Sequence, residues 1–465
     1  MSLTKNQIVS LEITGITAQG SGVGRVWDEE GSPGMTVFVP FTAMGDHIRC
    51  RILKVQKNHA YGRLEEVVSP SADRIRGEAD CPAFGKCGGC AWRHISYEAE
   101  CRYKRQQVAD ALQRIGGLGL EPEPLLAAPQ SDRYRNKAQF PVAMGPYRPM
   151  AGFYAPRSHR LVEVKDCLLQ PPVFAELVAA VLYWAKKAGV SLYDEELKAG
   201  LLRHIYIRQA EATGEIGVCL VCTSGKLPEP RLLVEQLRDR TPDLAGVTVN
   251  INRADTNVVL GETFFTLWGQ EAVEDELCGL RFRLSPQSFY QVNRRQAERL
   301  YELAAEMAGL TGEQTLLDLY CGTGTIGLSM AARAGRVIGV ETVPQAVEDA
   351  RRNAERNGIA NARFLCADAG EAAVRLAREG VRPDVVVLDP PRKGCAPAVI
   401  DTVAAMAPRR VVYVSCDPAT LARDLKCFAE RGYDTRRAVP VDLFPRTPHV
   451  ECCALLTKRE DAGNS

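Results

Sequence analysis

Short runs of alternating apolar and polar residues fill the first 68 residues of the chain. Examples are IVSLEI (8–13) and IRCRIL (48–53), and a glycine-rich turn, GSGVG (20–24), lies between them. Alternation with a period of two is typical of strands that bury one face. We therefore predict a small OB-like β-barrel over residues 3–68.

After a short Ser-Pro linker at 69–71, the pattern becomes mixed. Cys101, Val108, Leu112 and Ile115 recur near helical spacing, which predicts a helix over 97–115 that ends at a glycine pair and could pack on the catalytic domain. From about 133 to 285 strands and turns dominate. We expect a second, α+β domain over residues 69–285.

From residue 315 onward, continuous apolar runs alternate with amphipathic ones. The apolar runs predict strands at 315–320, 336–341, 362–366, 384–388 and 410–415. Helical patterns separate or follow them at 325–334, 344–357, 370–379, 397–406 and 418–431. This alternation predicts an α/β domain with a doubly wound, Rossmann-like parallel sheet over residues 286–460.

Composition narrows the class of protein. Of 465 residues, 46% are hydrophobic and 25% are charged, as in ordinary soluble globular chains. The N-terminus has no apolar signal core and no membrane-spanning run follows, so we expect a cytoplasmic protein that does not span a membrane. In that compartment the 16 cysteines would be reduced, and they are candidates for ligands, nucleophiles or small core residues. Because the net charge is only +1, any binding to nucleic acid has to be local.

A glycine turn, CGTGTIG (321–327), follows the first strand of the α/β domain and opens a helix. This fingerprint indicates a nucleotide-like cofactor, either a dinucleotide or S-adenosylmethionine. Asp318, Glu341, Asp368 and Asp389 all lie at or just beyond strand ends. Four acids suit the cationic sulfonium of S-adenosylmethionine better than a pyrophosphate.

Four motifs in order then give a specific resemblance. DLYCGTGTIGL (318–328), DPPRKG (389–394), SCDP (415–418) and HVE (449–451) together resemble the RNA uracil C5-methyltransferases, including those of 23S ribosomal RNA. FYQVN (289–293) is similar to the family's entry to its catalytic domain, and the first 66 residues resemble its TRAM barrel. The resemblance implies a class I methyltransferase domain that binds S-adenosylmethionine through Gln291, Tyr320, Glu341 and Asp389. It also implies an RNA substrate, with 23S rRNA expected and tRNA as the alternative. We expect a monomer, although the sequence leaves the oligomeric state open.

The DPPR motif leaves a second reaction open. A related Asp/Asn-Pro-Pro-aromatic turn presents hydrogen-bond acceptors to an exocyclic amine in amino-group methyltransferases, but here Arg392 replaces the aromatic ring. Methylation of a base amine is therefore the alternative enzymatic reaction. The non-enzymatic alternative is an RNA-binding iron–sulfur sensor with an inactive methyltransferase fold.

Methylation of uracil C5 requires a cysteine nucleophile, since thiolate addition at C6 turns C5 into an effective carbon nucleophile. Cys416 directly follows a predicted strand and precedes Asp417-Pro418, a predicted helix start that would lower a thiol pKa while Asp417 opposes it. Cys321, in the cofactor turn, is the rival. A base must remove the C5 proton, and the resemblance assigns that role to Glu451.

A second group of cysteines has ligand spacing. Cys81-x5-Cys87-x2-Cys90 surrounds glycines that allow tight folding, and Cys167 matches the family's distant fourth cysteine. Four thiolates suit a structural zinc or an iron–sulfur cluster. The resemblance favours a [4Fe–4S] cluster, which would make the central domain an iron–sulfur domain. Cys219 and Cys222 are predicted to be core residues.

Residues 133–165 combine basic and aromatic side chains. Seven lysines and arginines face one glutamate, with five Tyr and Phe residues interleaved. Such a surface can neutralise phosphates and stack bases, although a solvated basic face with core aromatics has the same pattern. An RNA uridine would have to flip out of its stack to reach Cys416.

Overall fold

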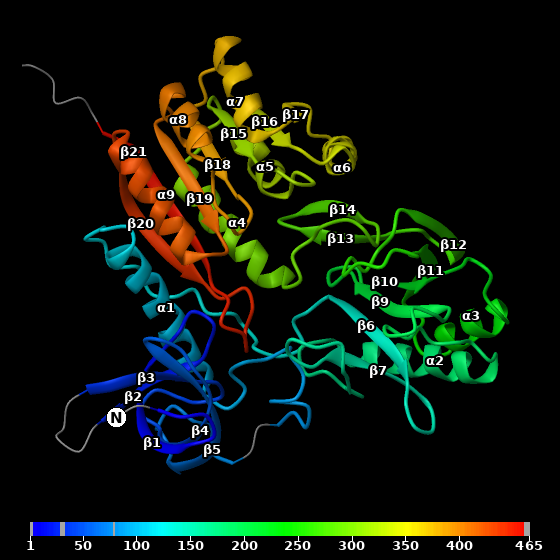
Figure 1. Cartoon of the computed structure of the whole chain (residues 1–465). Helices are drawn as coiled ribbons and strands as arrows, with labels where there is room; N and C mark the ends of the chain where they lie inside the picture. Colours follow the sequence, from blue (N-terminus) through cyan, green and yellow to red (C-terminus); the bar gives the residue numbers. More distant parts are fainter. Residues whose placement is uncertain (1–2, 28–32, 78–79, 460–465) are drawn as a thin grey trace, which may run out of the picture.

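The computed structural model describes residues 3–27, 33–77 and 80–459 (Figure 1). The expected end of the last domain, residue 460, lies outside these ranges. The described chain contains a closed barrel, two seven-stranded sheets and a two-stranded hairpin. In the described part of the chain, no helix has the length and apolar character needed to cross a membrane.

The N-terminal barrel has the strand order β1-β2-β3-β5-β4. Its strands are β1 (Ile8–Ile16), β2 (Gly22–Trp27), β3 (Pro33–Val39), β4 (His47–Val55) and β5 (His59–Ser69). Val9, Leu11 and Ile13 alternate into its core, as the period-two pattern predicts. Gly24 of β2 lies so close to β1 that a Cβ there would be 2.4 Å from the Glu12 backbone oxygen.

The central sheet has the order β12-β11-β10-β9-β6-β7-β8. Its strands are β6 (Lys137–Met144), β7 (Pro149–Tyr154), β8 (Leu161–Glu163), β9 (Leu202–Gln209), β10 (Ile216–Cys222), β11 (Leu244–Ile251) and β12 (Thr263–Gly269). Cys219 and Cys222 are buried in β10, which confirms that they are core residues.

Two helices of the central region were not expected from the sequence. They are α2 (Val173–Lys187) and α3 (Pro230–Arg238), and they pack on the central sheet. Strands and turns dominate this region as expected, and α2 had no clear helical signal because it is apolar over much of its surface. A short, strongly apolar run can be either a strand or a buried helix.

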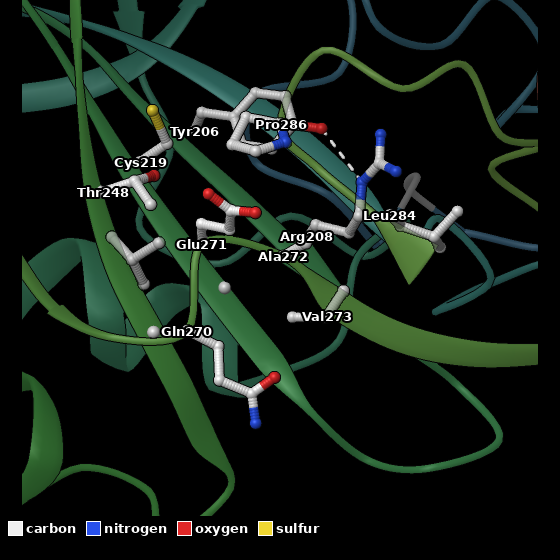
Figure 2. A pocket seen from close by; sticks show the side chains of 13 residues that line it. Tyr206, Arg208, Cys219, Thr248, Gln270, Glu271, Ala272, Val273, Leu284 and Pro286 are labelled. Atoms are coloured by element: carbon white, nitrogen blue, oxygen red, sulfur yellow. Dashed lines mark hydrogen bonds between the residues drawn. The ribbon is translucent and has the colours of Figure 1, made fainter. Parts of the chain in front are cut away.

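The hairpin of β13 (Val273–Leu277) and β14 (Leu280–Leu284) follows this sheet in the chain. A cavity of about 20 Å³ is lined by central-sheet residues and by this hairpin, and in it Arg208 Nε donates to Tyr206 Oη at 3.0 Å (Figure 2). That volume holds little more than one water, so the cavity is too small for a nucleoside cofactor.

The C-terminal sheet has the order β17-β16-β15-β18-β19-β21-β20. Its strands are β15 (Thr315–Leu319), β16 (Arg336–Glu341), β17 (Ala362–Cys366), β18 (Val385–Leu388), β19 (Arg410–Ser415), β20 (Tyr433–Val441) and β21 (Glu451–Lys458). The first five in chain order run parallel, while β21 lies antiparallel between β19 and β20. The predicted doubly wound sheet is confirmed, and β21 is an inner strand of it.

Helices cover both faces of this sheet. They are α4 (Arg294–Ala308), α5 (Thr325–Met330), η1 (Ala331–Arg333), α6 (Pro344–Arg356), α7 (Ala369–Arg378), α8 (Pro397–Met406) and α9 (Pro418–Glu430). A core on one face includes residues of α4, α5 and α6, and a core on the other includes residues of α7, α8 and α9. The second core also contains Val108 and Leu112 of α1 (Tyr97–Arg114), a helix that comes from far earlier in the chain (Figure 1).

Candidate active site

The carboxyl ends of β15 and β18 meet where the strand order reverses, the usual ligand site of such a sheet. Asp318 lies here, 1% exposed, and its Oδ2 accepts from the Gly327 backbone N–H at 2.9 Å. Its Oδ1 has no hydrogen-bond partner among the described residues. Gly327 has to be glycine, because a Cβ would lie 2.7 Å from Asp318 Oδ2. Burial raises the pKa of Asp318 to about 8, and the charges of Asp389 and Glu341 add to the shift.

Glu341, the last residue of β16, is tied to the glycine turn. Its Oε2 accepts from the Gly322 N–H at 3.1 Å, and its Oε1 accepts from Thr342 and Val343 at 2.8 and 2.9 Å. A carboxylate has about four acceptor positions, so capacity for a ribose hydroxyl remains. These bonds orient Glu341 before any ligand binds.

The other three residues expected to bind the cofactor lie at different places around Asp318 and Glu341. Asp389 follows β18, and burial raises its pKa to about 7. Tyr320 follows β15 in a left-handed conformation, with φ of 67°, and its side chain is close to Cys395. Gln291 lies just before α4, and its carbonyl accepts from Asn136 Nδ2 at 3.0 Å.

Cys416 and Glu451 meet through strand register. In the antiparallel β19–β21 pair the last matched residues are Ser415 and Cys452. Cys416 comes directly after this pair on one strand and Glu451 directly before it on the other, and the charge of Glu451 acts on the Cys416 thiol. Glu451 is 5% exposed and Cys416 is half-buried.

The surroundings of Cys416 and Glu451 raise the pKa values of both side chains. Burial raises the pKa of the Cys416 thiol to about 11, and the charges of Glu451 and Asp389 add to this, whereas Arg392 opposes it. Burial also raises the pKa of Glu451 to about 8, with Asp389 adding and Arg392 opposing. A carboxyl group whose pKa lies near neutrality is suited to proton transfer.

Cys321, the rival nucleophile, is 5% exposed and packs inside the cofactor turn. Burial raises the pKa of its thiol well above the ordinary value, and Asp318 and Glu341 add to the shift.

Sequence reasoning noted Arg392 without giving it a supporting role, and it missed Asp424. Arg392 is the basic group that acts on both Cys416 and Glu451, and its only sequence signal is its place in DPPRKG. Behind that loop, Asp424 Oδ2 accepts from the Cys395 N–H at 2.8 Å and from Tyr413 Oη at 2.6 Å. Asp424 is an ordinary helix position in the sequence, so nothing local indicates this role.

A cavity of about 1140 Å³ extends from the barrel to His449, two residues before Glu451. On the barrel side it is lined by Phe38, His59 and Tyr61, whose rings meet edge-on or tilted at 5.2 to 5.8 Å. Tyr61 is 43% exposed. Exposed rings beside arginines form surfaces on which unpaired bases stack.

Four arginines of the basic segment 133–165 fall into two kinds. Arg133 pairs with both Asp166 carboxylate oxygens at 2.6 and 2.7 Å, and Arg148 pairs with Glu163 at 2.6 Å. Arg135 and Arg157 line the large cavity instead. Only part of this segment is therefore available for phosphate.

Cys81, Cys87, Cys90 and Cys167 all line the same large cavity. Burial raises the pKa of the Cys90 thiol to about 12; Arg93 opposes this shift, and Cys167 and Cys87 add to it. Among the described residues, however, no three metal-binding side chains are drawn together around one ion position.

Comparison with known proteins gives the family. Residues 235–459 match the tRNA (uracil-5-)-methyltransferase family model, and residues 3–64 match the TRAM domain. The chain is 42% identical to an uncharacterised RNA methyltransferase of Halalkalibacterium halodurans, over 98% of both chains, and 41% identical to one of Clostridium tetani, over 97% of both.

A solved structure also matches nearly the whole chain. It is the tRNA (uracil-54, C5)-methyltransferase of Pyrococcus abyssi in complex with S-adenosyl-L-homocysteine, with a TM-score of 0.77 and 28% identity over 97% of this chain and 100% of that one. The barrel, the class I methyltransferase sheet and these matches lead to one conclusion: this chain belongs to the S-adenosylmethionine-dependent RNA uracil-5-methyltransferase family.

Proposed function

We propose that the protein methylates C5 of a uridine in RNA, with Cys416 as the nucleophile and Glu451 as the base. The observation that carries this proposal is the β19–β21 register, whose last pair, Ser415 and Cys452, leaves Cys416 and Glu451 as the next residues at this end of the sheet. An amine methyltransferase needs no such cysteine, so this pair favours carbon methylation.

The reaction would proceed through a covalent adduct on the RNA base. The Cys416 thiolate adds to C6, and the electron pair of the C5–C6 double bond moves onto C5 and O4. S-adenosylmethionine, when bound, would supply the methyl group from its sulfonium. C5 would take this methyl group as the bond between the methyl carbon and sulfur breaks. Glu451 then takes the C5 proton, the double bond reforms, and the Cys416–C6 bond breaks to return the thiolate.

Arg392 supports the thiolate in this scheme. In the free protein the pKa of Cys416 lies near 11, so little thiolate exists at neutral pH. Arg392 lowers that pKa, and the positive charge of the methyl donor would act in the same direction. Thiolate formation would thus be coupled to the presence of the donor.

For cofactor binding we propose the residues at the switch point. Glu341 would take the ribose hydroxyls, and Asp389, Tyr320 and Gln291 would complete the site. Support comes from the prior orientation of Glu341 by three backbone N–H groups and from the acids beside it, which suit a cation.

We propose 23S rRNA as the substrate, supported by the resemblance of the four motifs. The second candidate is tRNA, favoured by the similarity to the Pyrococcus abyssi enzyme. Mapping 5-methyluridine in both RNAs from cells with and without the gene distinguishes them: loss from 23S rRNA alone supports the proposal, and loss from tRNA alone overturns it.

We also propose that the four cysteines of the large cavity hold a [4Fe–4S] cluster. Their shared lining of one cavity supports this proposal. Protein purified without oxygen is expected to contain iron and acid-labile sulfide, and Cys90→Ser is expected to lose both. Stoichiometric zinc without sulfide would contradict the cluster and keep the four ligands.

The proposed reaction is tested with Glu451→Gln, which keeps the shape of the side chain but cannot take the C5 proton. The variant should consume one equivalent of S-adenosylmethionine and accumulate a methylated protein–RNA adduct on ordinary uridine RNA. Glu306→Gln, a change at an exposed glutamate of the same domain, is the control and should turn over normally. Normal turnover of Glu451→Gln would remove Glu451 from the mechanism.

A further inference from the structure

Residues 442–450 connect β20 to β21 and deliver the chain to Glu451. Val441 pairs with Glu451 across the β20–β21 ladder, so this connection begins one residue beyond the partner of the base. The position of residues 442–446, named here the junction segment, therefore bears directly on the position of Glu451.

Four consecutive carbonyl oxygens of the junction segment are held by four separate parts of the chain. Their donors are Asn293 Nδ2 to Leu443 at 3.1 Å, Lys104 Nζ to Phe444 at 3.1 Å, Tyr134 Oη to Pro445 at 2.9 Å and Ala91 N to Arg446 at 2.9 Å. These donors come from the residue before α4, from α1, from the irregular segment just before β6, and from the segment after Cys90. The junction segment is thus fixed by regions far apart in the sequence.

Lys104 is the centre of these contacts. Its ammonium donates to Asp442 Oδ1 at 2.6 Å, to Glu100 Oε1 at 2.7 Å and to the Phe444 carbonyl, which uses all three of its N–H bonds. The side chains of Lys104, Glu100 and Asp442 are all fully buried. Removing one member of a buried ion pair is costly because its partner keeps an uncompensated charge.

Helix α1 holds the junction segment at both ends. Tyr97 Oη donates to Asp442 Oδ2 at 2.8 Å, and Glu100 Oε1 accepts from the Arg446 N–H at 2.7 Å. Tyr97, Glu100 and Lys104 recur at spacings of three and four, so they share one face of α1. This face of α1 therefore forms hydrogen bonds with both the first and the last residue of the junction segment.

We propose that Lys104 is a positioning residue for Glu451, acting through the junction segment, and that Tyr134 assists it. The inference rests on the proposed function of Glu451 as the base. Cys416 does not belong to this segment, because it lies between the end of β19 and the start of α9. Loss of Lys104 should therefore displace the base more than the nucleophile, and slow proton removal more than adduct formation.

Two variants test this proposal on uridine RNA in a single turnover with methyl-labelled S-adenosylmethionine. Tyr134→Phe removes only the hydroxyl on Pro445, and Lys104→Met removes the buried charge. A denaturing gel separates the methylated protein–RNA adduct from released RNA. Methylation should remain within about twofold of wild type, while adduct resolution slows about fivefold in Tyr134→Phe and about 100-fold in Lys104→Met.

The matched control is Tyr433→Phe. Tyr433 is 1% exposed, and its hydroxyl donates to the Pro408 carbonyl at 2.9 Å, the same kind of bond away from the junction segment. This variant should resolve the adduct at the wild-type rate, which separates positioning from a general loss of stability.

Wild-type adduct resolution in Tyr134→Phe would overturn the inference, whether or not Lys104→Met folds. A second trapping experiment, on 5-fluorouridine RNA, keeps that failure apart from failure of the proposed function. Suppose that wild-type protein is trapped on 5-fluorouridine RNA through Cys416, while both variants resolve the adduct on uridine RNA at the wild-type rate. Only the positioning role then fails. If wild-type protein is not trapped, the proposed function and this inference fail together.

Discussion

At the residue scale, the site concentrates carboxyl groups that resist ionisation. Burial raises the pKa values of Asp318, Asp389 and Glu451 to about 8, 7 and 8, and Asp389 contributes to the shifts of both other groups. A cation placed among them would relieve this repulsion. The acids therefore form a site that prefers a positively charged ligand once they lose their protons.

This preference predicts a pH dependence of ligand binding. Deprotonation of Asp318 and Asp389 between pH 6 and 8 should strengthen the binding of cationic S-adenosylmethionine by about tenfold. S-adenosylhomocysteine, which lacks the sulfonium charge, should change much less over the same range. Titration calorimetry of both ligands measures this difference, and parallel affinity profiles would show that the acids do not sense the sulfonium.

Much at this scale could be predicted from the sequence. Acids at the ends of parallel strands converge whatever the loops do, so Asp318, Glu341 and Asp389 meet as expected. The direction of the Cys416 pKa shift could not be predicted, because it depends on burial and on Glu451, 35 residues further along the chain.

At the scale of elements, α9 begins directly after Cys416. Asp417 is its N-cap, and its Oδ1 accepts from the Ala419 and Thr420 N–H groups at 2.9 and 3.0 Å. This cap fixes the turn that presents the nucleophile.

Removing the cap should therefore affect both stability and chemistry. Asp417→Ala should lower the free energy of unfolding by about 1 kcal/mol, the usual value of an N-cap. Ser96→Ala, which removes the cap of α1, should cost about the same. Denaturant unfolding measures both, and only Asp417→Ala should also slow adduct formation; equal adduct rates in the two variants would deny Asp417 a role in presenting Cys416.

Elements with strong periodicity were predicted well, from β15 to α9, because apolar strands and amphipathic helices alternate there. Helix α2 was missed because its apolar surface hides the helical period. The β19–β21 register, which brings Cys416 and Glu451 to the same end of the sheet, also lay beyond the sequence, because pairing between strands far apart in the chain has no local signal.

At the scale of the whole molecule, one cavity brings together the barrel rings, the four cysteines and residues 447–449, which precede Glu451. Arg135 and Arg157 line it, whereas Arg133 is committed to Asp166 and to the carbonyl groups of Cys167 and Gln170. The basic residues of one segment should thus differ in their effect on RNA binding.

Salt dependence of RNA affinity tests this division. Arg135→Ala and Arg157→Ala should each reduce the slope of log affinity against log salt by about 0.7, the value for one phosphate contact on single-stranded RNA. Arg133→Ala should leave the slope unchanged and lower thermal stability instead. A slope that falls only in Arg133→Ala would reverse the assignment.

Contacts at this scale carry no local sequence signal. Lys104 and Asp442 are 338 residues apart, and Lys104 occupies an ordinary position in an amphipathic helix. Only the folded chain shows that α1 supports the segment before Glu451.

The central claim, covalent catalysis by Cys416, is tested most directly by trapping on RNA that carries 5-fluorouridine at the target. Fluorine cannot leave as a cation, so the adduct should persist after methyl transfer. Peptide mapping by mass spectrometry should locate the RNA on Cys416, with trapping abolished in Cys416→Ala and retained in Cys321→Ala. Undiminished trapping by Cys416→Ala, or attachment at Cys321, would contradict the claim.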